Sequence, residues 1–370
     1  MTDRSPRQAL PDPRAGHRPV TLGMIGTGDW GRNLLRNLAR AGELVAICDR
    51  RPEALAALRT AYPQARAETD PEAIFRDPEI EAIAIAANSS AHYSLARAAL
   101  EAGKHVLVEK PLAQSGREAA HLNELAEARG LVLMVGHLLI YHPAVDKLRA
   151  LVRGGELGGI RYLYAQRLNL GKIRQDENAL WSFGPHDVSV VLDLVGAMPT
   201  RVSAVGHAYL QPGIEDVVFV HLEFPSGQLA HIHLSWLDPH KIRRLTLVGE
   251  KKMAVFDDME STEKVRIYDK GVGGAAGEIL SYQDALTLRF GDILIPEITM
   301  REPLELECKD FVSAIRERRP PRASGRGGLR VVQVLEAASH SLAGGGVPVR
   351  LEVDLAAQKA ATTAARAGRS

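Results

Sequence analysis

Short apolar segments alternate with helical segments through the first part of the chain. The apolar runs cover residues 20–26, 43–49, 81–87, 105–111 and 131–137. Their length and unbroken apolar character are typical of strands buried on both faces of a parallel sheet. The segments between them place leucine and alanine at helical spacing. This alternation predicts an α/β fold, with a doubly wound parallel sheet over residues 19–141.

The second half of the chain contains segments in which apolar and polar residues alternate with a period of two. These segments are 161–171, 217–237 and 243–258, and the last two are each divided by a turn, at 225–227 and 249–250. They predict strands and hairpins of one open antiparallel sheet, followed by amphipathic helices at 307–321 and 328–346. We assign residues 142–352 to this substrate and oligomerisation domain. An open sheet leaves one face to be covered, which predicts a homodimer or homotetramer through this sheet.

The composition excludes several classes of protein. The 370 residues are 45% hydrophobic and 25% charged, with a formal net charge of +1, so we expect neither a nucleic-acid nor a membrane partner. Cys48 and Cys308 lie far apart and lack CxxC spacing, which favours neither a disulfide framework nor a metal site. Residues 1–18 are rich in Pro and Arg without an apolar core, which predicts a disordered leader and a cytoplasmic protein. We expect a mobile loop at 271–277, and we assign no function to the tail at 353–370.

A glycine-rich loop follows the first predicted strand. It reads Gly26-Thr27-Gly28-Asp29-Trp30-Gly31. In such a loop Gly26 permits a tight turn, Gly28 lets the backbone approach a pyrophosphate, and Gly31 lets the following helix pack on the strand. The helix then offers free N–H groups to the phosphates. The loop predicts a dinucleotide site, with another nucleotide or a methyl donor as the alternative.

Asp49 ends the second predicted strand and favours NAD as the cofactor. Its carboxylate can accept hydrogen bonds from both hydroxyls of the adenosine ribose, and its charge repels a 2′-phosphate. Arg50 and Arg51 follow directly, and either could instead pair with a 2′-phosphate. We therefore expect NAD, with NADP as the alternative.

Three further segments resemble one known family. They are AGKHVLVEKP (102–111), NSSAHYSLARAALEAGKHV (88–106) and HPAVDKLRALVRGGELGGIRYL (142–163). Their motifs and order resemble the glucose–fructose oxidoreductase/inositol dehydrogenase (Gfo/Idh/MocA) family. The resemblance implies an N-terminal Rossmann domain and a C-terminal α+β domain with a large open, mostly antiparallel sheet.

The resemblance also assigns roles to residues near the strand ends. It implies that Lys110 is catalytic, which suits its place at the carboxyl edge of the sheet, although a solvated strand-end lysine is the alternative. Where many members carry Thr-Pro, this chain has Ala87-Asn88, and His137 lies where many have an amide or aromatic residue near the nicotinamide ribose. The predicted cofactor-binding set is Gly26, Thr27, Gly28, Asp29, Trp30, Gly31, Asp49, Arg50, Ala87, Asn88, His92, Glu109, Lys110 and His137.

The segment WSFGPHDVSV (181–190) places His186 beside Asp187 at what we interpret as the start of a helix. Taken alone, the pair could be a structural histidine and a first-turn acid favoured by the helix dipole. The family resemblance implies instead that His186 lies in the active site, and it leaves the role of Asp187 open. Family members carry acids where this chain has Ser182 and Ser189. We predict that His186 acts mainly by hydrogen bonding, with Lys110 as the main proton carrier.

The run RLNLGKIRQDENALWSFGPHD (167–187) resembles the members that act on nucleotide-linked sugars, such as UDP-N-acetylglucosamine 3-dehydrogenases. Arginine suits a diphosphate, whereas amides and an indole ring suit sugar hydroxyls and a ring face. The alternative is that Arg167 and Arg174 are surface charges. The predicted substrate-binding set is Lys110, Arg167, Asn169, Arg174, Asn178, Trp181, His186 and Asp187.

These observations together predict an NAD(H)-dependent oxidoreductase. We expect it to move a hydride between the nicotinamide and a ring carbon, C3, of a nucleotide-linked sugar such as UDP-N-acetylglucosamine. Three alternatives stay open: a ketoreductase for nucleotide-linked keto-sugars, an inositol or free-sugar dehydrogenase, and a non-catalytic NAD-binding regulator. A catalytic lysine argues against the regulator. No metal is expected, because hydride and proton transfer of this kind need none.

Overall fold

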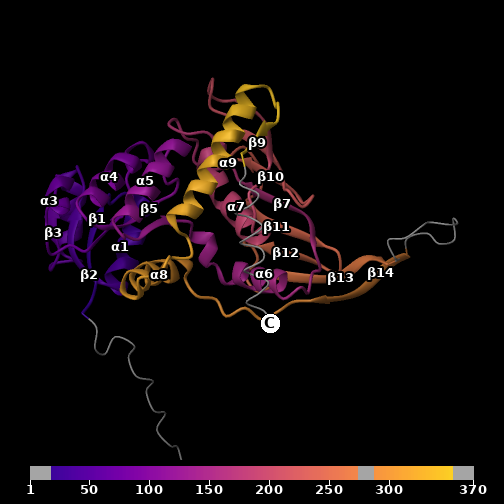
Figure 1. Cartoon of the computed structure of the whole chain (residues 1–370), viewed down its shortest axis with the longest axis horizontal. Helices are drawn as coiled ribbons and strands as arrows, with labels where there is room; N and C mark the ends of the chain where they lie inside the picture. Colours follow the sequence, from indigo (N-terminus) through magenta and orange to yellow (C-terminus); the bar gives the residue numbers. More distant parts are fainter. Residues whose placement is uncertain (1–17, 274–286, 353–370) are drawn as a thin grey trace, which may run out of the picture.

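The computed structural model describes residues 18–273 and 287–352, in which two sheets form the framework of the molecule (Figure 1). The predicted leader, apart from Arg18, and the tail at 353–370 lie outside the described residues. The predicted loop at 271–277 lies partly outside, and its first three residues belong to a strand. Within the described ranges, no helix has the length and apolar character that crossing a membrane requires.

The first sheet has six parallel strands in the order β3-β2-β1-β4-β5-β6. The strands are β1 (Thr21–Ile25), β2 (Glu43–Cys48), β3 (Arg66–Glu68), β4 (Ala82–Ile85), β5 (His105–Glu109) and β6 (Leu133–Gly136). The doubly wound prediction is confirmed, and each predicted strand is present. The sequence missed β3, because three partly polar residues at a sheet edge carry no apolar run.

Helices cover both faces of this sheet. They are α1 (Asp29–Ala41), α2 (Pro52–Arg59), α3 (Pro71–Phe75), α4 (Ser89–Glu101) and α5 (Gly116–Ala128). Leucines of α1 pack on Leu22 and Met24 of β1, while α4 and α5 pack on the opposite face with Ile83 and Val106. Burial on both faces explains why these strands are apolar throughout.

A helix from the end of the chain completes this first core. Helix α8 (Pro303–Glu317) packs beside α1 and buries Leu304 and Phe311 there (Figure 1). The hydroxyl of Tyr141 donates a hydrogen bond to Asp310 of α8 at 2.7 Å. The predicted division at residue 142 therefore places α8 in the second half of the sequence, although the helix packs against the first sheet.

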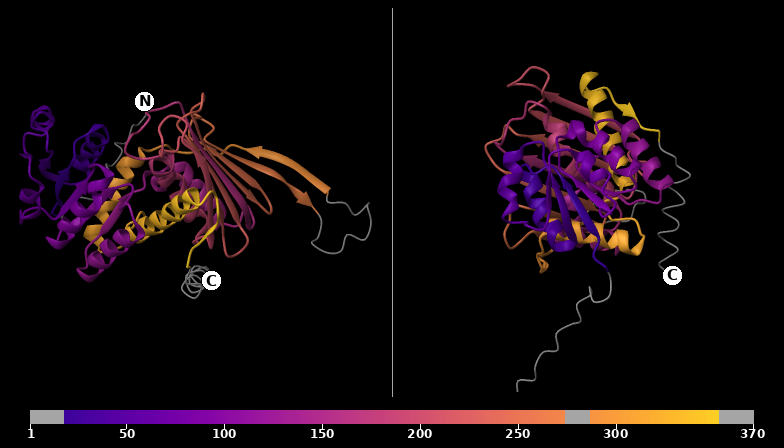
Figure 2. Two further views of the ribbon diagram at one scale, coloured as in Figure 1. Left: turned by 90° about the horizontal axis from the view of Figure 1, so that it is seen from above. Right: turned by 90° about the vertical axis from the view of Figure 1, so that its left-hand side faces the viewer.

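The second sheet has nine strands in the order β14-β13-β12-β11-β7-β10-β9-β8-β15. They are β7 (Ile160–Leu168), β8 (Arg201–His207), β9 (Val217–Glu223), β10 (Leu229–Ser235), β11 (Ile242–Gly249), β12 (Met253–Asp257), β13 (Val265–Gly273), β14 (Thr287–Leu294) and β15 (Val349–Arg350). All neighbouring pairs are antiparallel except β7 and β10. The prediction of a mostly antiparallel second sheet is confirmed. Figure 2 shows β13 and β14 extending away from the rest as a two-stranded arm.

In the part of the chain that the structure describes, helices cover only one face of the second sheet. They are α6 (Pro143–Arg153), α7 (Ala179–Val195) and α9 (Gly325–Ala343), and the short 3-10 helix η1 (Leu138–Tyr141) precedes α6. On β7, Leu163 and Ala165 are buried beneath these helices, whereas Tyr162 and Tyr164 are exposed on the outer face. The period-two pattern of the sequence thus arises because one face of the sheet is covered and the other is open.

Helix α7 starts earlier than the sequence suggested. The Asn178 side chain caps it by accepting a hydrogen bond from the N–H of Trp181 at 3.1 Å, and Pro185 lies inside the helix. The interpretation of 181–190 as a helix start is therefore wrong. Because Asn178 caps the first turn of α7, His186 and Asp187 lie near the middle of the helix. The prediction failed because a proline usually marks a helix boundary, whereas Pro185 lies inside this helix.

Candidate active site

A cleft of about 520 Å³ lies where the carboxyl ends of the first sheet meet the second sheet and α7. The residues before β7 contribute Gly28, Asp29, Trp30, Gly31, Ala87, Asn88, His92, Glu109 and Lys110. The remaining part of the chain contributes Arg167, Asn169, Lys172, Arg174, Asp176, Glu177, Ser182, Phe183, His186 and Arg243. Doubly wound sheets bind ligands at this edge, so the cleft is the candidate active site.

The glycine loop between β1 and α1 is shaped to admit a ligand. Gly26 has a φ of 92°, and a Cβ atom there would lie 2.4 Å from the carbonyl oxygen of Ala86. A Cβ on Gly31 would lie 2.3 Å from the carbonyl oxygen of Gly26. Gly28, in contrast, faces open space. Two glycines are thus needed for packing, and the third leaves the room that a pyrophosphate requires beside the start of α1.

Asp49 lies behind this loop and organises it. Its carboxylate accepts hydrogen bonds from the N–H and hydroxyl of Thr27 at 2.8 and 2.7 Å, and from the Arg51 side chain at 3.0 and 3.1 Å. Burial raises the pKa of Asp49, but the bonds from Arg51 and Thr27 outweigh it, so the pKa lies below its ordinary value. Asp49 is therefore ionised. Arg50, predicted beside it, is exposed.

Lys110 projects into the cleft directly after β5. Its ammonium group donates a hydrogen bond to the carbonyl oxygen of Ser182 in α7 at 3.0 Å. Burial lowers the pKa of Lys110, against the opposing effect of the Glu177 and Glu109 carboxylates. A lysine with a lowered pKa exchanges protons more readily near neutral pH, as a general base requires.

Two other residues of the first half hold the cleft wall in place. The indole N–H of Trp30 donates to the Glu109 carboxylate at 2.5 Å, and burial raises the pKa of Glu109. The ring of His92 lies between the carbonyl oxygens of Pro111 at 2.7 Å and Ala87 at 3.0 Å. His92 thereby ties together the segments that follow β4 and β5.

His186 reaches the same cleft from α7. Burial, together with the charges of Lys110 and Arg167, holds the pKa of His186 well below its ordinary value, so the ring is neutral. Its Nδ1 atom has no hydrogen-bond partner among the residues that the structure describes. Ser189 donates its hydroxyl to the backbone carbonyl of His186 at 2.8 Å rather than to the ring. A neutral imidazole can donate or accept a hydrogen bond with a hydroxyl group.

Asp187 pairs with an arginine of β7. Its carboxylate accepts hydrogen bonds from the Arg167 guanidinium at 2.6 and 3.1 Å, and both side chains are buried. The interpretation of Asp187 as a first-turn acid is therefore wrong, because the carboxylate neutralises a charge on the neighbouring strand. Arg167 lines the cleft, so Asp187 positions it.

The predicted substrate residues separate into two groups. Arg167, Asn169 and Arg174 line the cleft with Lys110 and His186. Asn178 and Trp181 are not among the lining residues. The amide of Asn178 donates to Glu215 at 2.6 Å, and the indole of Trp181 donates to the Ser339 hydroxyl at 2.9 Å. Both side chains are engaged in the packing of α7.

The cleft is also lined by Lys172, Phe183 and Arg243, which were not predicted from the sequence. Lys172 and Phe183 belong to the run that was singled out, so their position could have been inferred. Arg243 had no such signal: the pairing of β11 with β7 places it directly opposite Arg167. Asp187 neutralises Arg167, and Asp258 lies 3.6 Å from Arg243, so each of the two arginines has a carboxylate beside it.

His137, predicted to contact the cofactor, lines a different cavity. Gly136, immediately before it, does line the cleft. Among the residues described, no three His, Cys, Asp or Glu side chains lie close enough to hold a metal ion.

Comparison with protein families gives two matches. Residues 20–137 match the model of the Gfo/Idh/MocA oxidoreductase family with an NAD-binding Rossmann fold, and residues 145–255 match a C-terminal domain of the same family. The first domain is therefore an NAD-binding Rossmann domain, as the sequence predicts.

Individual relatives agree with these matches. UDP-N-acetylglucosamine 3-dehydrogenase from Acidithiobacillus ferrooxidans is 30% identical over 314 residues, covering 85% of this chain and 94% of the relative. Its solved structure has a TM-score of 0.74 at 28% identity and covers 88% of this chain and 98% of that one. A 4-carboxy-2-hydroxymuconate-6-semialdehyde dehydrogenase from Sphingobium is 25% identical, covering 82% and 93%. Levoglucosan dehydrogenase, solved with NADH and L-sorbose, shares the fold at 21% identity, with a TM-score of 0.76 and coverage of 91% and 100%.

Proposed function

The chain belongs to the Gfo/Idh/MocA oxidoreductase family, and from this premise we propose that it oxidises a nucleotide-linked sugar with NAD. The proposed substrate is UDP-N-acetylglucosamine, and the proposed reacting carbon is C3. The observation that carries the proposal is that Lys110 and His186 line the same cleft as Gly28 of the dinucleotide loop. A proton acceptor and a hydrogen-bonding group thus lie beside the place where the cofactor binds.

The charge of the cleft supports a substrate with a diphosphate. Arg167, Lys172, Arg174 and Arg243 all line it on the side of the second sheet. Asp187 compensates Arg167, Glu177 lies 3.2 Å from Arg174, and Asp258 lies 3.6 Å from Arg243. Asp176 also lines the cleft. The phosphates of a nucleoside diphosphate can bind these basic side chains, whereas a free sugar or inositol has no anionic group to pair with them. The Acidithiobacillus relative is named for UDP-N-acetylglucosamine.

The proposed chemistry divides between the cofactor and the chain. The nicotinamide ring supplies the acceptor for the hydride that leaves the sugar carbon. Neutral Lys110 accepts the proton of the hydroxyl group on the same carbon, so that the carbon becomes a ketone. Neutral His186 hydrogen-bonds that oxygen and fixes its position. In the reverse direction, a reduced nicotinamide would supply the hydride to the ketone carbon and protonated Lys110 would return the proton to its oxygen, which gives the ketoreductase reaction.

The proposed cofactor is NAD rather than NADP. The ionised carboxylate of Asp49 lies at the end of β2, behind the glycine loop. A 2′-phosphate on the adenosine ribose would approach this charge. Arg51 already pairs with Asp49, at 3.0 Å, which reduces its availability for a phosphate.

We also propose that the open face of the second sheet pairs two or four copies of the chain. Tyr162, Tyr164, Val205 and Leu229 are exposed on this sheet. A face with this much exposed apolar surface gains free energy when a second copy covers it. Light scattering at increasing concentration tests the oligomer, and a monomer at every concentration would contradict it.

The substrate proposal is tested by following NADH formation with a panel of compounds. We expect turnover with UDP-N-acetylglucosamine, and much less with N-acetylglucosamine, myo-inositol or free hexoses. Arg174→Met should raise the KM for the nucleotide sugar while leaving NADH affinity unchanged, because Arg174 serves the diphosphate. Faster turnover of a free sugar or inositol would contradict the substrate. Tight NADH binding without turnover of any compound would indicate the regulator instead.

A further inference from the structure

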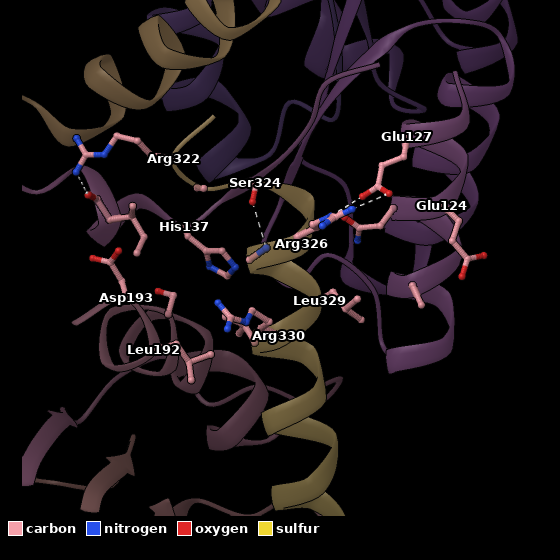
Figure 3. Close-up of a pocket in the computed structure, with 17 residues that line it drawn as sticks. Glu124, Glu127, His137, Leu192, Asp193, Arg322, Ser324, Arg326, Leu329 and Arg330 are labelled. Atoms are coloured by element: carbon pink, nitrogen blue, oxygen red, sulfur yellow. Dashed lines mark hydrogen bonds and ion pairs between the residues drawn. The ribbon is translucent and has the colours of Figure 1, made fainter. Parts of the chain in front are cut away.

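A second cavity, of about 680 Å³, lies between α5, α7 and the first turns of α9 (Figure 3). It shares no lining residue with the candidate active site. Its volume falls within the range of sites that bind small molecules, about 300–1,000 Å³. The proposed oxidoreductase reaction makes no use of it.

The most unusual group in this cavity is the ring of His137. Only 2% of the residue is exposed, yet neither ring nitrogen has a hydrogen-bond partner among the described residues. Figure 3 shows the ring pointing into the cavity. Burial and the charge of Lys110 lower the pKa of His137 to about 3, so the ring is neutral, with one donor and one acceptor. A buried polar group without a partner is costly, and a ligand in the cavity would supply one.

The second group is Arg330, which lies in the second turn of α9. Its guanidinium has no ion pair or hydrogen bond within the described residues, although it is half-buried and burial lowers its pKa. Figure 3 shows it directed into the cavity on the same side as His137. An arginine that is partly withdrawn from water without a carboxylate partner favours binding of an anion.

The other charged groups around the cavity are already compensated. Arg326 donates to Glu127 at 2.6 and 3.0 Å, and Arg322 pairs with Asp146. Asp193 accepts a hydrogen bond from Arg149 at 2.8 Å. Glu124 is exposed at the rim on α5.

The start of α9 also contributes positive charge to the cavity. Ser324 caps the helix by accepting a hydrogen bond from the N–H of Gly327 at 3.3 Å, and both residues line the cavity. The N-terminal turn of a helix carries a partial positive charge. The charge left without a partner inside the cavity is therefore positive, with Arg330 as its main source.

We propose that this cavity is a second binding site, for a small molecule whose carboxylate or phosphate group pairs with Arg330 and accepts a hydrogen bond from His137. The guanidinium donates to two oxygens of the anion in its plane. The imidazole N–H donates to a second lone pair of one of these oxygens or, in a phosphate, to a third oxygen. A single free arginine, with carboxylates at the rim, selects one anionic group rather than a polyanion. The site is independent of the substrate of the cleft.

The test measures anion binding to the full chain while NADH saturates the cleft. Inorganic phosphate and succinate serve as the probes, at constant ionic strength, with binding followed by the shift in melting temperature. Arg330→Met should weaken binding of at least one probe by about tenfold or more, as expected when a charged, two-point contact is lost. His137→Phe should weaken it in the same direction. Arg174→Met, the matched arginine of the cleft, should change it less than twofold, in line with an unrelated site.

A second variant and a spectroscopic measurement complete the test. If Arg330→Met is unstable, Arg330→Gln gives the same comparison with a polar side chain. The imidazole resonances of His137 are identified by their absence in His137→Gln. They should shift when phosphate or succinate is added and binds. The proposal is wrong if neither probe binds, if Arg330→Met and Arg330→Gln bind like the unmodified protein, or if only Arg174→Met abolishes binding.

Discussion

The two sides of the cleft are built in different ways. On the side of the first sheet, Gly28 and Lys110 lie in the residues that follow β1 and β5, so the ends of these strands bring them to the cleft. On the side of the second sheet, Arg167 and Arg243 are brought together by strand pairing, and Asp187 of α7 holds Arg167 from a different element. On the first side, local sequence thus brings the residues to the cleft, whereas on the second side contacts between different elements do so.

This difference predicts different consequences of substitution. A change on the first side should remove chemistry or cofactor contacts while the fold persists. A change on the second side leaves a partner unpaired in the interior, so the fold itself should lose stability.

The largest effect is expected for Asp187→Asn. It leaves the Arg167 guanidinium buried without a carboxylate, and we expect the free energy of unfolding to fall by about 3–5 kcal/mol. Urea unfolding followed by circular dichroism measures this change. The double variant Arg167→Met with Asp187→Leu removes both charges and should recover most of the lost stability. A loss below about 1 kcal/mol for Asp187→Asn would mean that the pair behaves as an exposed one.

The next effect is on the first side, with Lys110→Ala. We expect kcat to fall by ~100-fold or more, since a general base is lost, while NADH affinity and unfolding free energy change little. Lys241→Ala, which alters an exposed lysine outside the cleft, serves as the control. An unchanged kcat would place the proton acceptor elsewhere.

The dependence of kcat on pH refines this test. Burial lowers the pKa of Lys110 from 10.5, so oxidation should increase with pH and level off below the ordinary lysine value. The neutral amine is the acceptor, so the rate grows as the proton is lost. This limb should be absent in Lys110→Ala, and its persistence there would assign it to another group.

His186→Ala should have a smaller effect, about tenfold on kcat, as expected for one hydrogen bond to the reacting oxygen. His186→Asn keeps a hydrogen-bonding group and should retain more activity than His186→Ala. Steady-state kinetics of the three proteins gives the ranking. If His186→Asn is as inactive as Lys110→Ala, the histidine is an acid–base partner and not only a hydrogen-bonding group.

The smallest effect concerns the choice of cofactor on the first side. We expect NADH to bind about fivefold more tightly than NADPH, since repulsion between Asp49 and a 2′-phosphate amounts to about 1 kcal/mol in a solvated setting. Fluorescence titration of both cofactors measures it. Arg51→Ala should increase the preference for NADH. Tighter binding of NADPH would show that Arg51, and not Asp49, controls this pocket.

The first side of the cleft could largely be predicted from the sequence. A parallel strand buried on both faces is apolar throughout, and a residue directly after it lies at the carboxyl edge of the sheet. The positions of Gly28, Lys110 and Glu109 follow from that rule. The family motif around His186 likewise placed the histidine near the cleft, although the start of α7 was misjudged because Pro185 lies inside the helix.

Local patterns in the chain are thus enough to predict the two sheets, the dinucleotide loop and the position of Lys110, because these features depend on neighbours within a few residues. Tertiary contacts, in contrast, place Arg243 opposite Arg167, pair Asp187 with Arg167, and pack α8 against the first sheet. They also turn His137 away from the cleft into a second cavity. These contacts join residues that are distant in sequence or on different elements. Their pairing is set by strand register and by the need to compensate buried charge, and neither leaves a local pattern in the chain.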